Sequence, residues 1–210
     1  MLDGKLTINE FLEKLGSKDA VPGGGGAAAL TASLGINLCK MAANLTVGKK
    51  KYANVEERMY EIIAECDKLS EEFVAFIQKD ADGFLPLSKA YGLPTDTEEE
   101  KKFKEETLER ELVNAAKVPF EIMEACLRGI NLSAEVAEKG SRLVVSDAAC
   151  AVNTLNSALK CASLNVYINT KYMKDKEKAV QMNLKADGII EAGGEIATKI
   201  FGDVVDSLKK

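Results

Sequence analysis

The residue with the clearest capacity for chemistry is Asp80, an acid placed on an apolar helical stripe. Phe73, Phe76 and Ile77 precede it by seven, four and three positions, which is the spacing of one helix face. Burial against such side chains raises the pKa of a carboxyl group, so that it can donate a proton near neutral pH. Asp82 falls toward the polar side of the same helix. The competing interpretation of Asp80 is a structural acid that pairs with a buried lysine or a helix N-terminus.

The chain contains no histidine, which restricts the chemistry that is available. Ser-His and Cys-His nucleophile pairs, imidazole general bases and the usual zinc sites are excluded. Proton transfer therefore has to use carboxylate, lysine, tyrosine, cysteine or water. The cysteines are odd in number and widely spaced, and no CxxC pair occurs: Cys39, Cys66, Cys126, Cys150 and Cys161. We interpret them as small buried core residues in a reducing compartment, and predict neither a disulfide nor a metal site.

A glycine-rich segment precedes the first long apolar helix. Pro22, Gly23, Gly24 and Gly25 form a turn that leads into this helix, and such turns can hold an anion at a helix N-terminus. The Lys-Ser/Thr pair of a P-loop is missing and no strand precedes the segment, so nucleotide binding is not expected. The segment is otherwise a flexible connection between helices, or a place where the backbone approaches a flat ligand or a second subunit.

Several polar residues lie at expected helix ends. Lys49, Lys50 and Lys51 follow a helix C-terminus, where the helix dipole favours cations. Three adjacent lysines in an acidic protein also suit a ligand with several negative charges, such as a chain of carboxylates. Ser146 is expected to cap the next long helix and Asp147 to follow it, with ligand binding as a secondary interpretation of both.

Two asparagines are expected on the inward face of that helix. Asn169 follows Val166 by three positions and Ala162 by seven, and Asn165 lies one turn before Asn169. Buried amides need hydrogen-bond partners, so these side chains either tie helices together or bind a polar ligand.

The elements that must position these residues are all helical. Apolar residues recur at helical spacing in almost every segment, and no segment alternates like a strand. The expected helices are 8–15, 27–45, 54 to 83 or 91, 97–140 with a kink or restart at Pro119, 146 onward, and 175–208. We predict a single all-α domain over residues 1–210, built as a bundle of five or six long helices.

The helix over residues 27–45 has two apolar faces, one of leucines and one of alanine, glycine and cysteine. A helix that is apolar on both sides is covered on both sides, so we expect at least a homodimer.

The net charge is −5, which argues against nucleic acid as the main partner. Polar residues interrupt the most apolar stretch, which argues against a membrane span, and Met1 to Lys5 shows no signal-peptide pattern. The expected location is the cytoplasm.

Taken together, these segments resemble the formiminotetrahydrofolate cyclodeaminase family, which includes bacterial methenyltetrahydrofolate cyclohydrolases. The residues that carry the resemblance are 22–25 with the alanine-rich helix after them, 44–52, Asp80 with Phe84, Ser146–Asp147 and 165–169. The resemblance implies an all-helical domain that dimerises and binds a tetrahydrofolate, often with its polyglutamate tail. It also implies that Asp80 protonates the leaving group and that no cofactor beyond the folate is needed. Ser141 stands where the family pattern has asparagine.

The resemblance implies conversion of 5-formiminotetrahydrofolate to 5,10-methenyltetrahydrofolate with release of ammonia. The alternative is the cyclohydrolase reaction, which opens the methenyl bridge to give 10-formyltetrahydrofolate. An alternative of another class is a non-catalytic helical binding or scaffold protein, in which the glycines, the lysines and Asp80 serve packing and surface roles.

Overall fold

The computed structural model describes residues 6–210, and it is helical as the sequence predicts. The first five residues, on which the expectation of no signal peptide depends, lie outside the described part. The elements in chain order are α1 (Ile8–Leu15), α2 (Gly24–Asn44), the 3₁₀ helix η1 (Lys50–Val55), α3 (Glu56–Tyr91), α4 (Glu98–Lys139), the 3₁₀ helix η2 (Arg142–Val144), α5 (Val145–Tyr172) and α6 (Lys176–Leu208). Residues 6–210 contain no strand, which confirms the all-α class.

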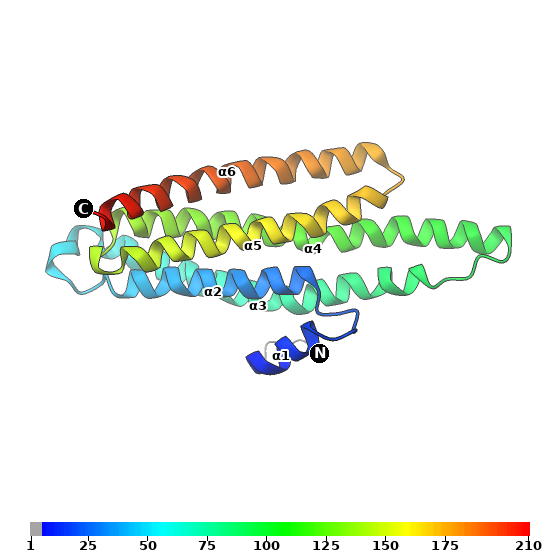
Figure 1. Ribbon diagram of the computed structural model, residues 1–210, viewed down its shortest axis with the longest axis horizontal. Coiled ribbons are helices and arrows are strands. Elements are labelled where there is room, and N and C mark those ends of the chain that lie inside the picture. Colours follow the sequence, from blue (N-terminus) through cyan, green and yellow to red (C-terminus); the bar gives the residue numbers. More distant parts are fainter. Residues whose placement is uncertain (1–5) are drawn as a thin grey trace.

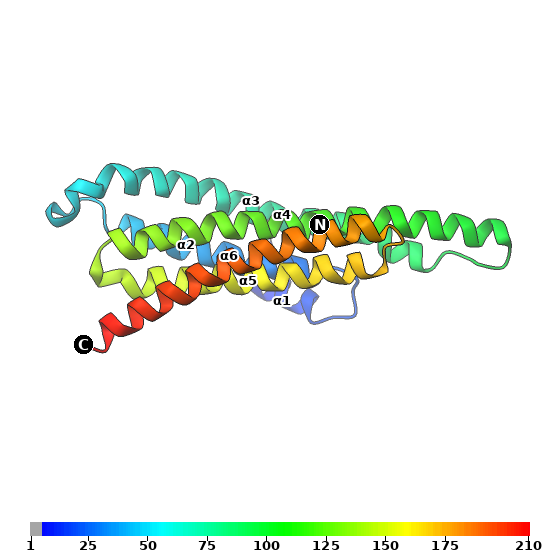
Figure 2. The same ribbon diagram turned by 90° about the horizontal axis from the view of Figure 1, so that it is seen from above.

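The long helices form a layered bundle. Figures 1 and 2 together show α2 and α5 side by side in one layer, with α3 and α4 in the layer behind them. Helix α6 packs along α5 and α4, and the short α1 lies outside the bundle against α2 and α3. The η1 segment, the connection between α4 and α5, and the C-terminus gather at one end of the bundle (Figure 1).

Local signals in the sequence account for several helix starts. Thr7 with Glu10 and Thr97 with Glu100 form the expected capping boxes at the starts of α1 and α4. The expected cap of α5 is wrong: Val144 is the N-cap residue without a side-chain bond, and Ser146 lies inside the first turn. Helix α4 also continues through Pro119 without restarting, because the rest of the helix is held by its packing against α3, α5 and α6.

Small residues let α2 approach its neighbours closely. Its buried face consists of glycine, alanine and cysteine with Ile36, and a Cβ atom on Gly35 would come within 2.8 Å of Leu155 Cγ on α5. The leucine face points outward instead, and Leu34 is 58% exposed.

The prediction of five buried cysteines is wrong for two of them: Cys150 and Cys161 lie exposed on α5. The 3.6-residue period of α5 turns both away from the core.

No helix within residues 6–210 combines the length and the apolar character that a membrane span needs.

Candidate active site

The N-terminus of α2 is the point at which three helices meet. Gly25 lies so close to the carboxyl oxygens of Asp80 on α3 that a Cβ atom would overlap them. A Cβ atom on Gly24 would lie 2.9 Å from both side-chain amide atoms of Asn165 on α5. The glycines are therefore required because the backbone of α2 is approached from two sides at once. Pro22, buried behind them, leads the chain into this turn.

Asp80 is half-buried on the apolar side of α3, next to Phe76 and Ile77. Burial raises the pKa of its carboxyl group from 3.8 to about 6, and a hydrogen bond from the Gly26 N–H partly offsets the rise. A pKa near 6 leaves an acid that can both give and take a proton close to neutrality. The carboxyl group also lies at the N-terminus of α2, where the helix dipole is positive. A helix N-terminus is one of the partners that the sequence suggests for a structural acid, and the hydrogen bond from Gly26 is that contact. Asp82 lies exposed on the polar side, as predicted, and accepts a hydrogen bond from Gln78 at 2.7 Å.

Asp80 opens onto a small cavity of about 130 Å³. The cavity brings together six of the predicted site residues: Gly23, Gly24, Gly25, Asp80, Asn165 and Asn169. Asn169 is buried, as predicted, and its Nδ2 donates to the Asn165 carbonyl at 2.7 Å. Of the residues that line this cavity, Asp80 alone carries a titratable side chain. The arrangement provides one proton donor or acceptor beside two amides, without a second acid.

Apolar side chains form the remaining walls of the cavity. Phe84 lies one turn beyond Asp80 and belongs to the family pattern, whereas Ala115, Pro119 and Ile168 were not predicted. Ile168 follows Asn165 by three positions, so helical spacing places it on nearly the same face and could have identified it. The sequence marks Pro119 only as a kink or restart of its helix, and no local signal marks Ala115. These walls suit the flat, largely apolar ring of a ligand.

The three lysines lie at the other end of α2. Lys49 Nζ donates to Ser141 Oγ at 3.0 Å, whereas the side chains of Lys50 and Lys51 are exposed. Tyr52 holds this segment against the α4–α5 connection, because its hydroxyl oxygen accepts from the Arg142 N–H at 3.0 Å. The same hydrogen bond is the main cause of the lowered pKa of Tyr52. Ser141, which replaces the expected asparagine, is thus a bonding partner of the lysine segment.

The predicted site residues consequently fall into two groups. Helix α2 has 21 residues and is about 30 Å long, and the cavity and the lysines lie at its opposite ends. Ser146 and Asp147, in the first turn of α5, belong to the lysine end. We name the first group, 22–25 with Asp80, Asn165 and Asn169, the acid end, and the second, 49–51 with Ser146 and Asp147, the lysine end. The structure does not bring the two ends together within one chain.

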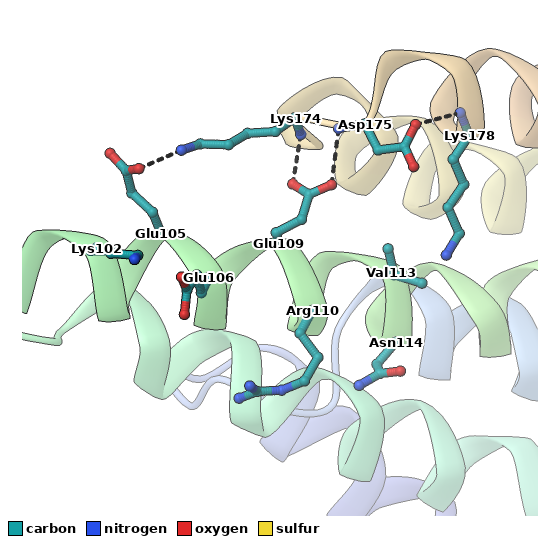
Figure 3. Close-up of a pocket in the computed structure, with 10 residues that line it drawn as sticks. All are labelled: Lys102, Glu105, Glu106, Glu109, Arg110, Val113, Asn114, Lys174, Asp175 and Lys178. Atoms are coloured by element: carbon teal, nitrogen blue, oxygen red, sulfur yellow. Dashed lines mark hydrogen bonds and ion pairs between the residues drawn. The ribbon is translucent and has the colours of Figure 1, made fainter.

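A larger cavity of about 690 Å³ lies between α4 and the turn that joins α5 to α6 (Figure 3). Its lining is mostly charged. Glu109 accepts hydrogen bonds from the backbone N–H groups of Lys174 and Asp175 at 2.6 and 3.0 Å, and the Lys174 side chain pairs with Glu105. This cavity contains none of the predicted site residues, and its ion pair and hydrogen bonds hold the α5–α6 turn against α4.

No group of three or more His, Cys, Asp or Glu side chains in residues 6–210 is arranged to hold a metal ion.

Known proteins with similar sequences and folds carry related names. A profile of the formiminotransferase-cyclodeaminase family matches residues 7–188. A methenyltetrahydrofolate cyclohydrolase of Methylorubrum extorquens is 36% identical, over 96% of this chain and 97% of that protein. The formimidoyltransferase-cyclodeaminase of Mus musculus is 30% identical over 94% of this chain, but the match spans only 37% of the mouse protein. A crystal structure of formiminotetrahydrofolate cyclodeaminase from Thermotoga maritima has the same fold, with a TM-score of 0.81, 24% identity, and coverage of 96% of this chain and 98% of that one.

The helical bundle and the single-acid cavity, together with these relatives, define an all-α enzyme of folate one-carbon metabolism. The chain belongs to the formiminotransferase-cyclodeaminase family. The resemblance drawn from the sequence motifs is thereby confirmed.

Proposed function

We propose that this protein hydrolyses the one-carbon bridge of 5,10-methenyltetrahydrofolate to give 10-formyltetrahydrofolate. The observation that carries the proposal is the Asp80 cavity, in which one carboxyl group with a pKa of about 6 lies beside two amides and an apolar wall. The full-length relative from Methylorubrum extorquens, named as a cyclohydrolase, supports this reaction over the deamination that the sequence analysis put first.

Asp80 has a defined part in each step of the proposed hydrolysis. Its carboxylate takes a proton from a water molecule while the water oxygen bonds to the methenyl carbon. The protonated carboxyl group then gives that proton to folate N5 as the bond between this carbon and N5 breaks. The hydroxyl group on the carbon releases its own proton to solvent in the same step, which leaves a formyl group on N10. A carboxyl group with a pKa near the working pH can serve both steps. Asn165 and Asn169 are the groups available to bind polar edges of the pterin ring.

The second candidate is the cyclodeaminase reaction, which the name of the mouse relative supports. In that reaction, folate N10 attacks the formimino carbon, and the proton of N10 passes to the imino nitrogen, which becomes an amino group. The resulting intermediate loses ammonia as the bond between carbon and this amino nitrogen breaks. Asp80 then supplies the proton that the departing nitrogen needs. Because the ring closure is intramolecular, holding N10 near the carbon provides much of the rate acceleration.

A spectroscopic assay distinguishes these reactions. The purified protein is given 5,10-methenyltetrahydrofolate and, separately, 5-formiminotetrahydrofolate, and the absorbance of the methenyl compound is followed. We expect it to disappear in the first mixture at a rate that depends on the protein concentration. Formation of the methenyl compound in the second mixture alone would assign deamination, and no change in either would refute both proposals.

We also propose that the protein works as a homodimer in the cytoplasm and needs no cofactor beyond the folate. The exposed side chains of Lys50 and Lys51 are the proposed binding site of a polyglutamate tail. The tail carries several carboxylates, which matches the positive charge of the lysine end.

A further inference from the structure

The two asparagines of the acid end use their amide nitrogen atoms within their own helix, which leaves their oxygen atoms as acceptors for the cavity. Asn165 Nδ2 donates to the Cys161 carbonyl at 2.9 Å, and Asn169 Nδ2 donates to the Asn165 carbonyl at 2.7 Å. Turning either amide over would put an oxygen atom against that carbonyl, where no hydrogen bond can form. Because both residues line the cavity, each contributes a hydrogen-bond acceptor to it.

Asn169 carries the more deeply buried of these two acceptors. The residue is 7% exposed, whereas Asp80 and Asn165 are half-buried. No group in residues 6–210 donates to Asn169 Oδ1, and the packing does not seal this atom from solvent. A buried acceptor that lacks a donor destabilises a protein, so this oxygen atom is suited to a donor inside the cavity.

The contacts around α2 put the Asn169 carboxamide at about the level of Asp80. Its nitrogen atom bonds to the turn of α5 that starts at Asn165, and the Asn165 side chain lies against Gly24. Asp80 lies against Gly25, the next residue of α2, and successive residues of a helix advance by about 1.5 Å. The amide oxygen on α5 and the carboxyl group on α3 therefore face the same small cavity.

Hydrolysis needs a water molecule whose two hydrogens are both held, because its oxygen atom then directs a lone pair at the methenyl carbon. The Asp80 carboxylate takes one hydrogen, and the other needs a second acceptor. Among the side chains that line the cavity, only the two asparagines provide one besides Asp80. A water molecule occupies about 30 Å³ in the liquid, so the cavity of about 130 Å³ has room for it.

We propose that Asn169 positions the attacking water: its Oδ1 atom accepts one hydrogen of the water while the Asp80 carboxylate takes the other as a proton. A lone pair of the water oxygen forms the bond to the methenyl carbon, and the electron pair of the carbon–nitrogen double bond returns to nitrogen. Asn169 holds the remaining hydroxyl hydrogen until the bond between carbon and N5 breaks and that proton leaves to solvent. Asn165, half-buried against Gly24, keeps the role of binding the pterin. This inference rests on the proposed function, because the deamination uses no water.

Steady-state kinetics with 5,10-methenyltetrahydrofolate test the assignment. Asn169→Leu keeps about the same side-chain size without an acceptor, so it should lower kcat by about 10²-fold while KM changes less than about threefold. Asn169→Ala should lower kcat less than Asn169→Leu, because the space that it opens admits a second water that can accept the hydrogen. A purely structural asparagine would give the opposite order, since leucine fills the site and alanine leaves a void.

The matched control is Asn153→Leu on the same helix. Asn153 Nδ2 donates to the Ala149 carbonyl at 2.9 Å, which is the same kind of bond, but Asn153 does not line the cavity. Its kcat and KM should stay within about twofold of the wild type. The inference is overturned by an Asn169→Leu variant with near-normal kcat, by a loss in this variant that lies in KM instead, or by an Asn169→Ala variant that is slower than Asn169→Leu.

A crystal structure of the protein without ligand tests the geometry without any turnover. We expect a water molecule within about 3.2 Å of both Asn169 Oδ1 and a carboxyl oxygen of Asp80 in the wild type, and no water there in Asn169→Leu. A protein donor on Asn169 Oδ1, or a wild type that lacks this water, overturns the inference. A wild type that holds the water but does not convert the methenyl compound overturns the proposed function rather than the water site.

Discussion

Replacing Asp80 with asparagine should lower activity and raise stability at the same time. Asparagine keeps the size of the side chain but has no titratable proton, and general acid–base catalysis is worth about 10²–10⁴-fold. We therefore expect turnover to fall by about that factor, while folate still binds because the cavity keeps its shape. Asp82→Asn, two positions along the same helix but exposed, is the matched control and should change turnover less than about twofold.

The stability effect follows from the direction of the pKa shift. The carboxyl group of Asp80 titrates at about 6 in the folded protein against 3.8 in the unfolded chain, so folding favours its protonated form. That contribution is fully present below pH 3.8 and is lost as the pH rises through about 6, which costs about 3 kcal/mol at higher pH. An asparagine side chain does not ionise, so the Asp80→Asn variant should be more stable than the wild type at pH 8, by at most about 3 kcal/mol. The two proteins should be equally stable near pH 3.5.

Thermal unfolding followed by circular dichroism from pH 3.5 to 8 measures this difference, and the folate assay measures turnover. For a chain of this size, 1 kcal/mol corresponds to about 2–4 °C in Tm. Near-normal turnover in Asp80→Asn would refute the catalytic assignment. A stability difference that does not change with pH would refute the argument from burial, whatever the effect on turnover.

Four other variants test the packing and the charges. Gly25→Ala should lower turnover by at least tenfold, because the added methyl group displaces the Asp80 carboxyl group from the N-terminus of α2. The pH–rate profile of this variant should also shift, which a purely structural defect would not cause. Lys50→Gln with Lys51→Gln should raise the KM for polyglutamylated folate much more than the KM for monoglutamate, and the difference between the two should shrink as salt is added. An equal rise in both KM values would show that these lysines only stabilise the end of a helix. Gly35→Ala should destabilise the protein by about 1–3 kcal/mol in denaturant unfolding, because the methyl group would lie 2.8 Å from Leu155 Cγ and 3.2 Å from the Leu155 backbone nitrogen on α5. Gly194→Ala, where nothing lies within 4 Å, should instead stabilise α6 by up to about 1 kcal/mol, and a loss there would contradict the packing argument.

The acid and its environment could be predicted from the sequence because both are properties of one helix. The 3.6-residue period places Asp80 with Phe73 and Phe76 wherever α3 lies in the fold, so its burial and raised pKa follow from spacing alone. The same reasoning identified Asn169 as buried and the leucine face of α2 as one side of that helix. Capping boxes are equally local, which explains why the starts of α1 and α4 were predicted correctly.

The start of α5 shows where local reasoning fails. Ser146 has the right residue type for a cap, yet η2 precedes the helix and Val144 takes the cap position. The turn is held from outside α5: Ser141 N–H donates to Thr46 Oγ1 at 2.9 Å, and Tyr52 accepts from the Arg142 N–H. No local pattern reveals such bonds, because their partners lie about ninety residues apart in the chain.

What the sequence by itself determined is therefore the helices, the side of each helix on which the reactive residues lie, and the family. Only the tertiary structure decided which residues meet. It placed Gly25 against Asp80 and Gly24 against Asn165, and it put Lys50 at the far end of α2 from all of them. The physical reason is that periodicity specifies an angle around a helix axis, whereas the position along that axis at which two helices touch depends on packing. Gly35 against Leu155 is one contact that sets this register between α2 and α5, and it joins residues that no local pattern relates.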